Sequence, residues 1–304
     1  MAELDDALAL TWDGGGGAAP GAVVGEVEVA RGHLGEGWVI GRAVNGGVLM
    51  ALAARAGAEV LGSAGHTAPL TWGAHFLSAA VVGDVEVRVE PLRLGRTVST
   101  VSVAVVQAGP DGPAERVRLV GTFGDLDRAE PVRRSPSPPS MPPPEQCPPA
   151  RRDASPAASG IVMLDRLDVR VDPATAGFAV GRPSRRGVIR AWLRMADGRE
   201  PDVAMLPYAV DALMPVTFDL GVLGWAPTME LTGQVLGTPA PGWLRVELST
   251  DTVVGDLVVE DACVWDSADR LVARSRQLAS VRFPQEGADA GAAPTASDGA
   301  GGAG

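Results

Sequence analysis

The chain has 304 residues, a length that favours two domains of ordinary size over one. Its formal net charge is -11, from 26 Lys and Arg against 37 Asp and Glu, so nucleic acid is not an expected partner. Apolar residues make up 46% of the chain, which excludes a wholly disordered protein.

The two cysteines give no sign of a disulfide framework or a zinc site. Cys147 lies in a Pro-rich stretch, Cys263 lies in an expected strand, and no CxxC pair is present. We therefore expect neither metal nor cofactor. The N-terminus is acidic where a signal peptide is basic, and no run of 18 apolar residues occurs. These features predict a cytoplasmic protein that does not insert into membranes.

The first half begins with a strand-like run at 25–32 and then predicts one long helix followed by four strands. Leu, Met and Ala recur at helical spacing over residues 45–65, which predicts about five helical turns ending at Gly62 or Gly65. Strand-like runs follow at 69–77, 84–93, 97–109 and 116–126. The second and third runs alternate between polar and apolar residues, so each is expected to bury one face.

The second half predicts the same order of elements. Strands are expected near 161–171 and 187–195, then a helix within 202–221, then strands at 227–237, 242–253, 256–266 and 270–283. The halves also align without gaps where Ala74–Glu90 stands opposite Gly233–Ser249. This repetition indicates an internal duplication.

Composition sets the predicted boundaries. Pro and Ser dominate one stretch, which predicts an extended or polyproline linker, and the Gly- and Ala-rich C-terminus predicts a disordered tail. The predicted units are an N-terminal domain at 1–130, with its folded part at 22–128, a linker at 131–159, a C-terminal domain at 160–284 and a tail at 285–304.

A long helix followed by an antiparallel run of strands favours an α+β fold in which a curved sheet wraps around the helix, the hotdog arrangement. One such unit leaves a sheet edge that must be paired, and two units in one chain can pair their edges. We therefore expect a double hotdog with its pocket between the two halves.

These residues resemble the bacterial acyl-CoA thioesterase II family, particularly its actinobacterial members. The likeness rests on 45–56, 75–96, the strand of Gln107, 211–221, 225–244 and 264–279. The resemblance implies two tandem hotdog domains that hydrolyse an acyl-CoA thioester to free acid and CoA. Acyl-CoA is then the expected partner, and a homo-oligomer of double hotdogs is compatible with it.

In that family an Asp, a Thr or Ser, and a Gln of the second hotdog hold the attacking water. By position, the Asp matches Asp211 in the expected helix and the Gln matches Gln277 in the last strand. The hydroxyl matches Thr228, with Thr232 as a reserve because residues four apart on a strand share a face. Relatives often carry a His-Ser pair where this chain has Leu231 and Thr232, so the choice of hydroxyl stays open.

The residue types suit hydrolysis by a carboxylate base. No GxSxG motif occurs, and all three histidines lie in the first half, which disfavours a Ser-His-Asp mechanism in the second. Asp211 stands among apolar residues, so partial burial is expected to raise its pKa. The alternatives are an exposed or ion-paired Asp211 and a Gln277 that faces solvent.

Asn45, Gly46 and Gly47 precede the long helix of the first half. They are predicted to bring backbone close to an acyl or phosphopantetheine chain, and the alternative is helix capping with tight packing.

Two other functions remain open from the sequence. A hotdog enoyl-CoA hydratase or dehydratase pairs an acid with a histidine, yet the second half has no histidine. An acyl-CoA-binding hotdog without turnover would keep Asn45, Gly46 and Gly47 but leave Asp211 and Gln277 unable to share one water.

Overall fold

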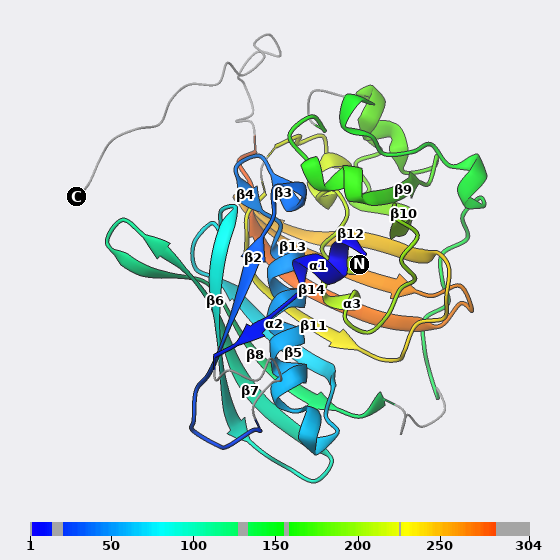
Figure 1. Ribbon diagram of the computed structural model, residues 1–304. Helices are drawn as coiled ribbons and strands as arrows, with labels where there is room; N and C mark the ends of the chain where they lie inside the picture. The colour runs from blue at the N-terminus through cyan, green and yellow to red at the C-terminus, as the bar shows by residue number, and fades with distance from the viewer. Residues whose placement is uncertain (1, 14–20, 127–132, 155–157, 225, 284–304) are drawn as a thin grey trace.

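The computed structural model describes residues 2–13, 21–126, 133–154, 158–224 and 226–283. Strands dominate these residues, and one long helix lies against them (Figure 1). The predicted disordered tail, 285–304, lies outside the described residues.

The first half contains the predicted long helix and all four predicted strands. Its helices and strands are α1 (Glu3–Ala7), β1 (Thr11–Trp12), β2 (Glu28–Leu34), β3 (Val39–Ile40), β4 (Ala43–Val44), α2 (Gly46–Val60), β5 (Ala68–Phe76), β6 (Gly83–Arg93), β7 (Val98–Gly109) and β8 (Gly112–Gly124). Short 3-10 turns occur at η1 (Glu36–Trp38) and η2 (Gly62–Ala64). The helix α2 ends just before Gly62, one of the two predicted ends.

The described residues of the second half form a strand within each predicted run, but they contain no long helix. The run 161–171 is only partly a strand, because residues 162–166 form a 3-10 turn. Its strands and single α-helix are β9 (Leu167–Val171), β10 (Val188–Met195), α3 (Leu206–Ala209), β11 (Thr228–Val235), β12 (Leu244–Val254), β13 (Leu257–Trp265) and β14 (Leu271–Ser280). The 3-10 turns are η4 (Pro144–Gln146), η5 (Arg152–Ala154), η6 (Val162–Arg166), η7 (Ala176–Val180) and η8 (Val216–Phe218).

The prediction of one helix over much of 202–221 is wrong, because only the four residues of α3 form an α-helix there. Pro215 has no N–H to donate, and its ring disfavours helical backbone at Met214. Pro215 itself has φ -53° and ψ 140°, which is not helical. Asp211 therefore lies in a turn after α3. The prediction that Asp211 lies on a helix is wrong.

Twelve strands form one sheet in the order β1-β2-β6-β7-β8-β5-β11-β14-β13-β12-β10-β9. The first-half and second-half strands meet where β5 pairs antiparallel with β11. Outward from this junction the first half runs β5, β8, β7, β6, β2 and the second half runs β11, β14, β13, β12, β10. In each half the four strands that follow the helical segment thus occur in the order first, fourth, third, second, and the next strand is one that precedes the helical segment. The two halves thus have the same strand order, as an internal duplication requires.

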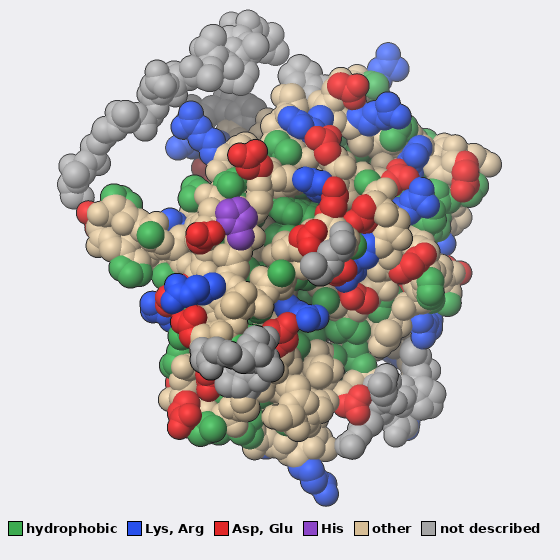
Figure 2. Space-filling view, in the orientation of Figure 1, with side chains coloured by type: hydrophobic (Ala, Val, Ile, Leu, Met, Phe, Trp, Pro, Cys, Tyr) green, Lys and Arg blue, Asp and Glu red, His purple; other side chains and the backbone are tan. Residues whose placement is uncertain are grey.

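The helix α2 packs against β5, β6, β7 and β8, and its side chains fill the core of the first half (Figure 1). Met50 and Leu52 on the helix and Trp72 on β5 are almost completely buried. Its N-terminal end reaches the second half, where α2 also contacts α3. Figure 2 shows acidic and basic side chains intermingled on the face it presents, which agrees with the many ion pairs between them.

The described part of the predicted linker is held against the second half. Trp265 Nε1 donates to the carbonyl of Pro136 at 3.2 Å, Arg245 Nη1 to that of Pro139 at 3.3 Å, and Trp192 Nε1 to that of Pro142 at 2.9 Å. The three acceptors are three residues apart, which is the repeat of a polyproline II helix. The extended conformation was predicted, but these contacts were not.

Candidate active site

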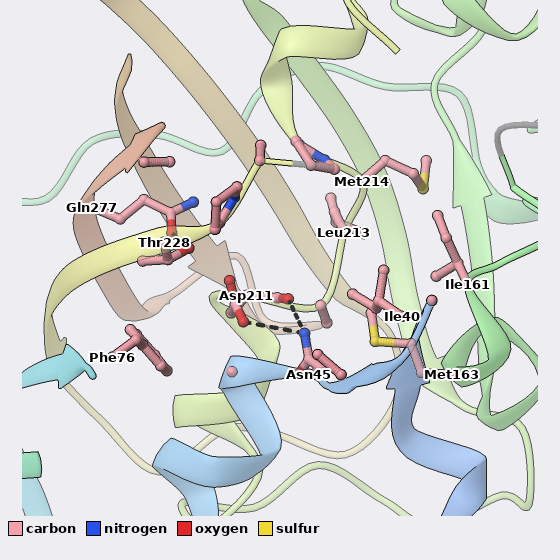
Figure 3. A pocket seen from close by; sticks show the side chains of 18 of the residues that line it. Ile40, Asn45, Phe76, Ile161, Met163, Asp211, Leu213, Met214, Thr228 and Gln277 are labelled. Atoms are coloured by element: carbon pink, nitrogen blue, oxygen red, sulfur yellow. Dashed lines mark hydrogen bonds between the residues drawn. The ribbon is translucent and has the colours of Figure 1, made fainter. Parts of the chain in front are cut away.

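A pocket of about 560 Å³ lies where the N-terminal end of α2 meets the strands of the second half. Asn45 and Gly46 line it from α2, Asp211 from the turn after α3, and Thr228 and Gln277 from β11 and β14. Figure 3 shows these side chains together at one end of the pocket, with Ile40, Ile161 and Met163 farther along. The pocket therefore has a polar end and an apolar end.

Asp211 is half-buried and anchored by the first half of the chain. Its Oδ2 accepts a hydrogen bond from the Gly47 N–H at 2.7 Å and from Asn45 Nδ2 at 3.2 Å, and Asn45 Nδ2 also lies 3.2 Å from the Asp211 carbonyl oxygen (Figure 3). Its Oδ1 accepts no hydrogen bond from any described residue. Burial raises the pKa of Asp211 to about 6, although the bonds from Gly47 and Asn45 oppose the shift. The raised pKa predicted from the sequence is confirmed.

The Asn45, Gly46 and Gly47 segment fits the capping and packing alternative closely. Asn45 Oδ1 caps α2 by accepting from the Val48 N–H at 3.1 Å. A Cβ on Gly46 would lie 2.8 Å from the Phe76 ring, and one on Gly47 would lie 3.0 Å from the Tyr208 carbonyl oxygen. Asn45 and Gly46 also line the pocket, whereas Gly47 does not and contributes through its bond to Asp211.

Thr228 and Gln277 belong to a chain of hydrogen bonds across three strands. The Thr228 hydroxyl donates to Gln277 Oε1 at 2.6 Å, and Gln277 Nε2 donates to Glu260 Oε1 at 2.5 Å. Glu260 Oε2 accepts from the Val216 N–H at 2.7 Å. Gln277 is buried, so the alternative in which it faces solvent is wrong.

The reserve residue Thr232 does not line the pocket, because a β-bulge changes which side chains share a face. Opposite β14, Thr228 pairs with Ala279 while Glu230 pairs with Leu278, so β11 holds one extra residue there. Beyond the bulge Leu231 pairs with Gln277, and Thr232 bonds Glu230 Oε1 at 2.6 Å. The assumption that residues four apart share a face is therefore wrong at this position, and Thr228 is the hydroxyl beside Gln277.

Glu260 on β13 is the pocket residue that the sequence reasoning missed. It is buried, lines the pocket, and faces inward with Val258, Ala262 and Val264. Burial raises its pKa to about 7, and the nearby charge of Asp211 adds to the shift. An acid at an inward position of an alternating strand was the available signal, since a buried carboxyl needs partners.

None of the three histidines lines the pocket. His33 and His75 are exposed, and His66 is buried with its Nδ1 2.8 Å from the Ser99 hydroxyl. Within the described ranges, no group of three or more His, Cys, Asp or Glu could hold a metal ion. No described helix is long and apolar enough to cross a membrane.

Comparison with known proteins identifies the family from both halves. Residues 34–124 match the acyl-CoA thioesterase N-terminal domain, and residues 144–281 match the acyl-CoA thioesterase C-terminal domain. An uncharacterized protein of Mycobacterium tuberculosis (strain H37Rv) is 32% identical over 277 residues, which cover 83% of this chain and 91% of that protein.

Solved structures agree in fold. A candidate thioesterase II from Thermobifida fusca YX is 29% identical with a TM-score of 0.79, covering 93% of this chain and 98% of that one. A protein of unknown function with a hotdog fold from Alicyclobacillus acidocaldarius is 20% identical with a TM-score of 0.78, covering 93% and 99%. This chain therefore has a hotdog fold, belongs to the acyl-CoA thioesterase family and is a thioester hydrolase.

Proposed function

We propose that this chain hydrolyses an acyl-CoA thioester to free acid and CoA by means of a water molecule held between Asp211 and Thr228. The observation that carries the proposal is the state of the Asp211 carboxylate. Its Oδ2 is fixed by Gly47 and Asn45 while Oδ1 accepts no hydrogen bond from the described residues. A pKa of about 6 leaves it mostly ionised at neutral pH and still basic enough to accept a proton.

The proposed reaction conserves atoms and charge. Asp211 accepts a proton from water as the water oxygen bonds to the thioester carbonyl carbon. The resulting tetrahedral intermediate collapses, the carbon–sulfur bond breaks, and the proton held by Asp211 passes to the departing CoA sulfur. Thr228 and Gln277 orient the water, a contribution of geometry rather than of proton transfer.

The N-terminus of α2 is our candidate for stabilising the negative charge that develops on the carbonyl oxygen. Gly46 lines the pocket at the first position of the helix, and its N–H has no acceptor among the described residues. The positive end of the helix dipole favours an anion there. An N–H fixed at the developing charge is the usual form of this stabilisation.

We further propose that the hotdog fold is a double hotdog, with domains at 1–130 and 160–284 joined by a linker at 131–159. The shared strand order of the two halves supports this division, although α3 and η8 replace the long helix in the second. A role in lipid metabolism and a cytoplasmic location are proposed with acyl-CoA as substrate. Size-exclusion chromatography with light scattering would decide whether double hotdogs form a homo-oligomer.

A panel of short-, medium- and long-chain acyl-CoA thioesters, assayed for release of free thiol, tests the proposed function. We expect turnover with at least one chain length, since the pocket offers an apolar end beyond the polar groups. Binding of acyl-CoA without thiol release from any of them would refute the proposal and favour a binding protein. The hydratase alternative requires a histidine beside the acid, and none lines this pocket.

A further inference from the structure

Glu260 is joined to two separate parts of the pocket. It stands directly opposite Gln277 across the β13–β14 ladder, and Gln277 Nε2 lies 2.5 Å from its Oε1. Its Oε2 accepts from the Val216 N–H at 2.7 Å, in the segment that follows Asp211. Both oxygens of a buried carboxyl are thus used within the pocket.

We infer that Glu260 is a positioning residue that sets the direction of the hydrogen bonds from Gln277 to Thr228, so that the Thr228 oxygen accepts a hydrogen bond from the attacking water. The inference rests on the proposed function and names no new step in the reaction. It assigns a role to a residue that does not itself need to touch the substrate.

The direction follows from which groups can donate. An ionised carboxylate only accepts hydrogen bonds, so Gln277 must turn its Nε2 toward Glu260 and its Oε1 toward Thr228. The Thr228 hydroxyl then donates its only hydrogen bond to Gln277 Oε1, so that only lone pairs of the hydroxyl oxygen face the pocket. A water between Thr228 and Asp211 donates one hydrogen bond to each and keeps a lone pair for the thioester carbon.

A protonated Glu260 permits the opposite direction. Its O–H can donate to Gln277 Oε1, the amide turns over, and Nε2 donates to the Thr228 oxygen. The Thr228 proton is then free to point at the water and occupy the lone pair that must attack. The same three side chains would hold the water in an unreactive orientation.

Burial of Glu260, assisted by nearby acidic groups, brings this change of direction into the neutral range. The acidic groups that act on it are Asp211 across the pocket and Asp261 next along β13, and both disfavour its ionisation. Among the residues that the structure describes, no Lys or Arg lines the pocket. With burial as the largest cause, the pKa of Glu260 rises to about 7.

The test is Glu260→Gln, which keeps the shape of the side chain but supplies an N–H that can donate to Gln277. We expect kcat to fall about 100-fold with KM changed less than about twofold, since orientation of the water and not acyl-CoA binding is lost. The acid side of the kcat/KM profile should change from two ionisations to one. Asp261→Asn is the matched control, because this neighbouring residue pairs with Arg276 away from the pocket. Its loss can move the ionisation of Glu260 but should leave the plateau value of kcat unchanged.

Thr228→Val separates this role from a merely structural one. If Glu260 acts through Thr228, then Glu260→Gln should cost little more activity in the Thr228→Val background. An equal loss in both backgrounds would overturn the inference and assign the effect to the bond with Val216. Retention of wild-type kcat and of both ionisations in Glu260→Gln would also overturn it.

Two further outcomes are decisive. If Glu260→Gln does not fold, the wild-type profile serves instead, and a single ionisation on its acid side would overturn the inference. Absence of thiol release by the wild-type protein would overturn the proposed function and this inference together. Wild-type turnover with an unaffected Glu260→Gln variant would overturn the inference alone.

Discussion

The two halves share a strand order but differ in the segment that precedes the strand at their junction, β5 in the first half and β11 in the second. In the first half this segment is the unbroken helix α2, and its side chains fill the core. In the second half the helix α3 ends at Ala209, and Asp211 lies in the turn that follows and lines the pocket. The first half, with its unbroken helix, thus supplies the groups that hold the carboxylate, Asn45 and Gly47. The second half, with its short helix, supplies the acid itself, Asp211.

The largest effect is expected from Asp211→Asn, which tests whether the second half supplies the base. The substitution keeps the shape of the side chain but removes the proton acceptor, so kcat should fall about 1000-fold while binding of a non-hydrolysable acyl-CoA thioether is retained. Free thiol release and calorimetric titration measure the two effects. Asp84→Asn in the first half is the control, because Asp84 is exposed and does not line the pocket. Near wild-type turnover by Asp211→Asn would remove Asp211 as the base.

The pH dependence of stability tests whether the acids that the second half contributes to the pocket are buried. The pKa of Asp211 rises from 3.8 to about 6 and that of Glu260 from 4.5 to about 7, so the folded protein holds protons that the unfolded chain loses. Each group therefore stabilises the fold fully below its unfolded pKa, and this contribution is lost as pH rises through the folded value. We expect a loss of at most about 3 kcal/mol per group between about pH 4 and pH 7.

Urea denaturation across this pH range measures the effect. The wild-type protein and Asp84→Asn should show the same decline, and Asp211→Asn a shallower one. Equal slopes in all three proteins would contradict the burial of an ionisable Asp211.

The contact between the halves is tested by Gly47→Ala. Its Cβ would lie 3.0 Å from the Tyr208 carbonyl oxygen and 2.9 Å from Asn45 Oδ1, so backbone must move. We expect a destabilisation of about 2 kcal/mol, and weaker catalysis because Asp211 loses its anchor. Thermal unfolding and thiol release measure both effects. Gly62→Ala, where a Cβ meets nothing within 4 Å, should leave both unchanged.

The smallest expected effect comes from Thr232→Val. Thr232 lies on the face of β11 away from Gln277, so its loss should change stability by less than about 0.5 kcal/mol and leave kcat unaltered. Thr228→Val should instead lower kcat about tenfold, because the hydroxyl beside Gln277 is removed. A larger effect at Thr232 than at Thr228 would show that the bulge does not select the hydroxyl.

Sequence patterns predicted the elements that depend on regular spacing. The helix α2 and the four strands after it follow from uninterrupted periodicity, and the strands of the second half do as well. The raised pKa of Asp211 also followed from its apolar neighbours.

What could not be predicted depends on local departures from regular spacing. The apolar periodicity at 202–221 predicts one helix, but Pro215 is incompatible with helical backbone at Met214 and is itself not helical. The extra residue in β11 is invisible without its partner strand, so the choice between Thr228 and Thr232 stayed open. Glu260 was missed because its role depends on the cross-strand neighbour Gln277, which only the register of β13 and β14 brings beside it.

The Pro-rich segment before the second half has a consequence for how this family can vary. Trp265, Arg245 and Trp192 bind backbone carbonyls at every third residue and do not bind the side chains between them. Substitutions between the contacts are therefore expected to be tolerated as long as the extended conformation is kept. A change of length by one or two residues would turn the next carbonyl away from its donor, whereas three added residues complete a full turn. Insertions and deletions in this segment of related chains should accordingly occur in multiples of three.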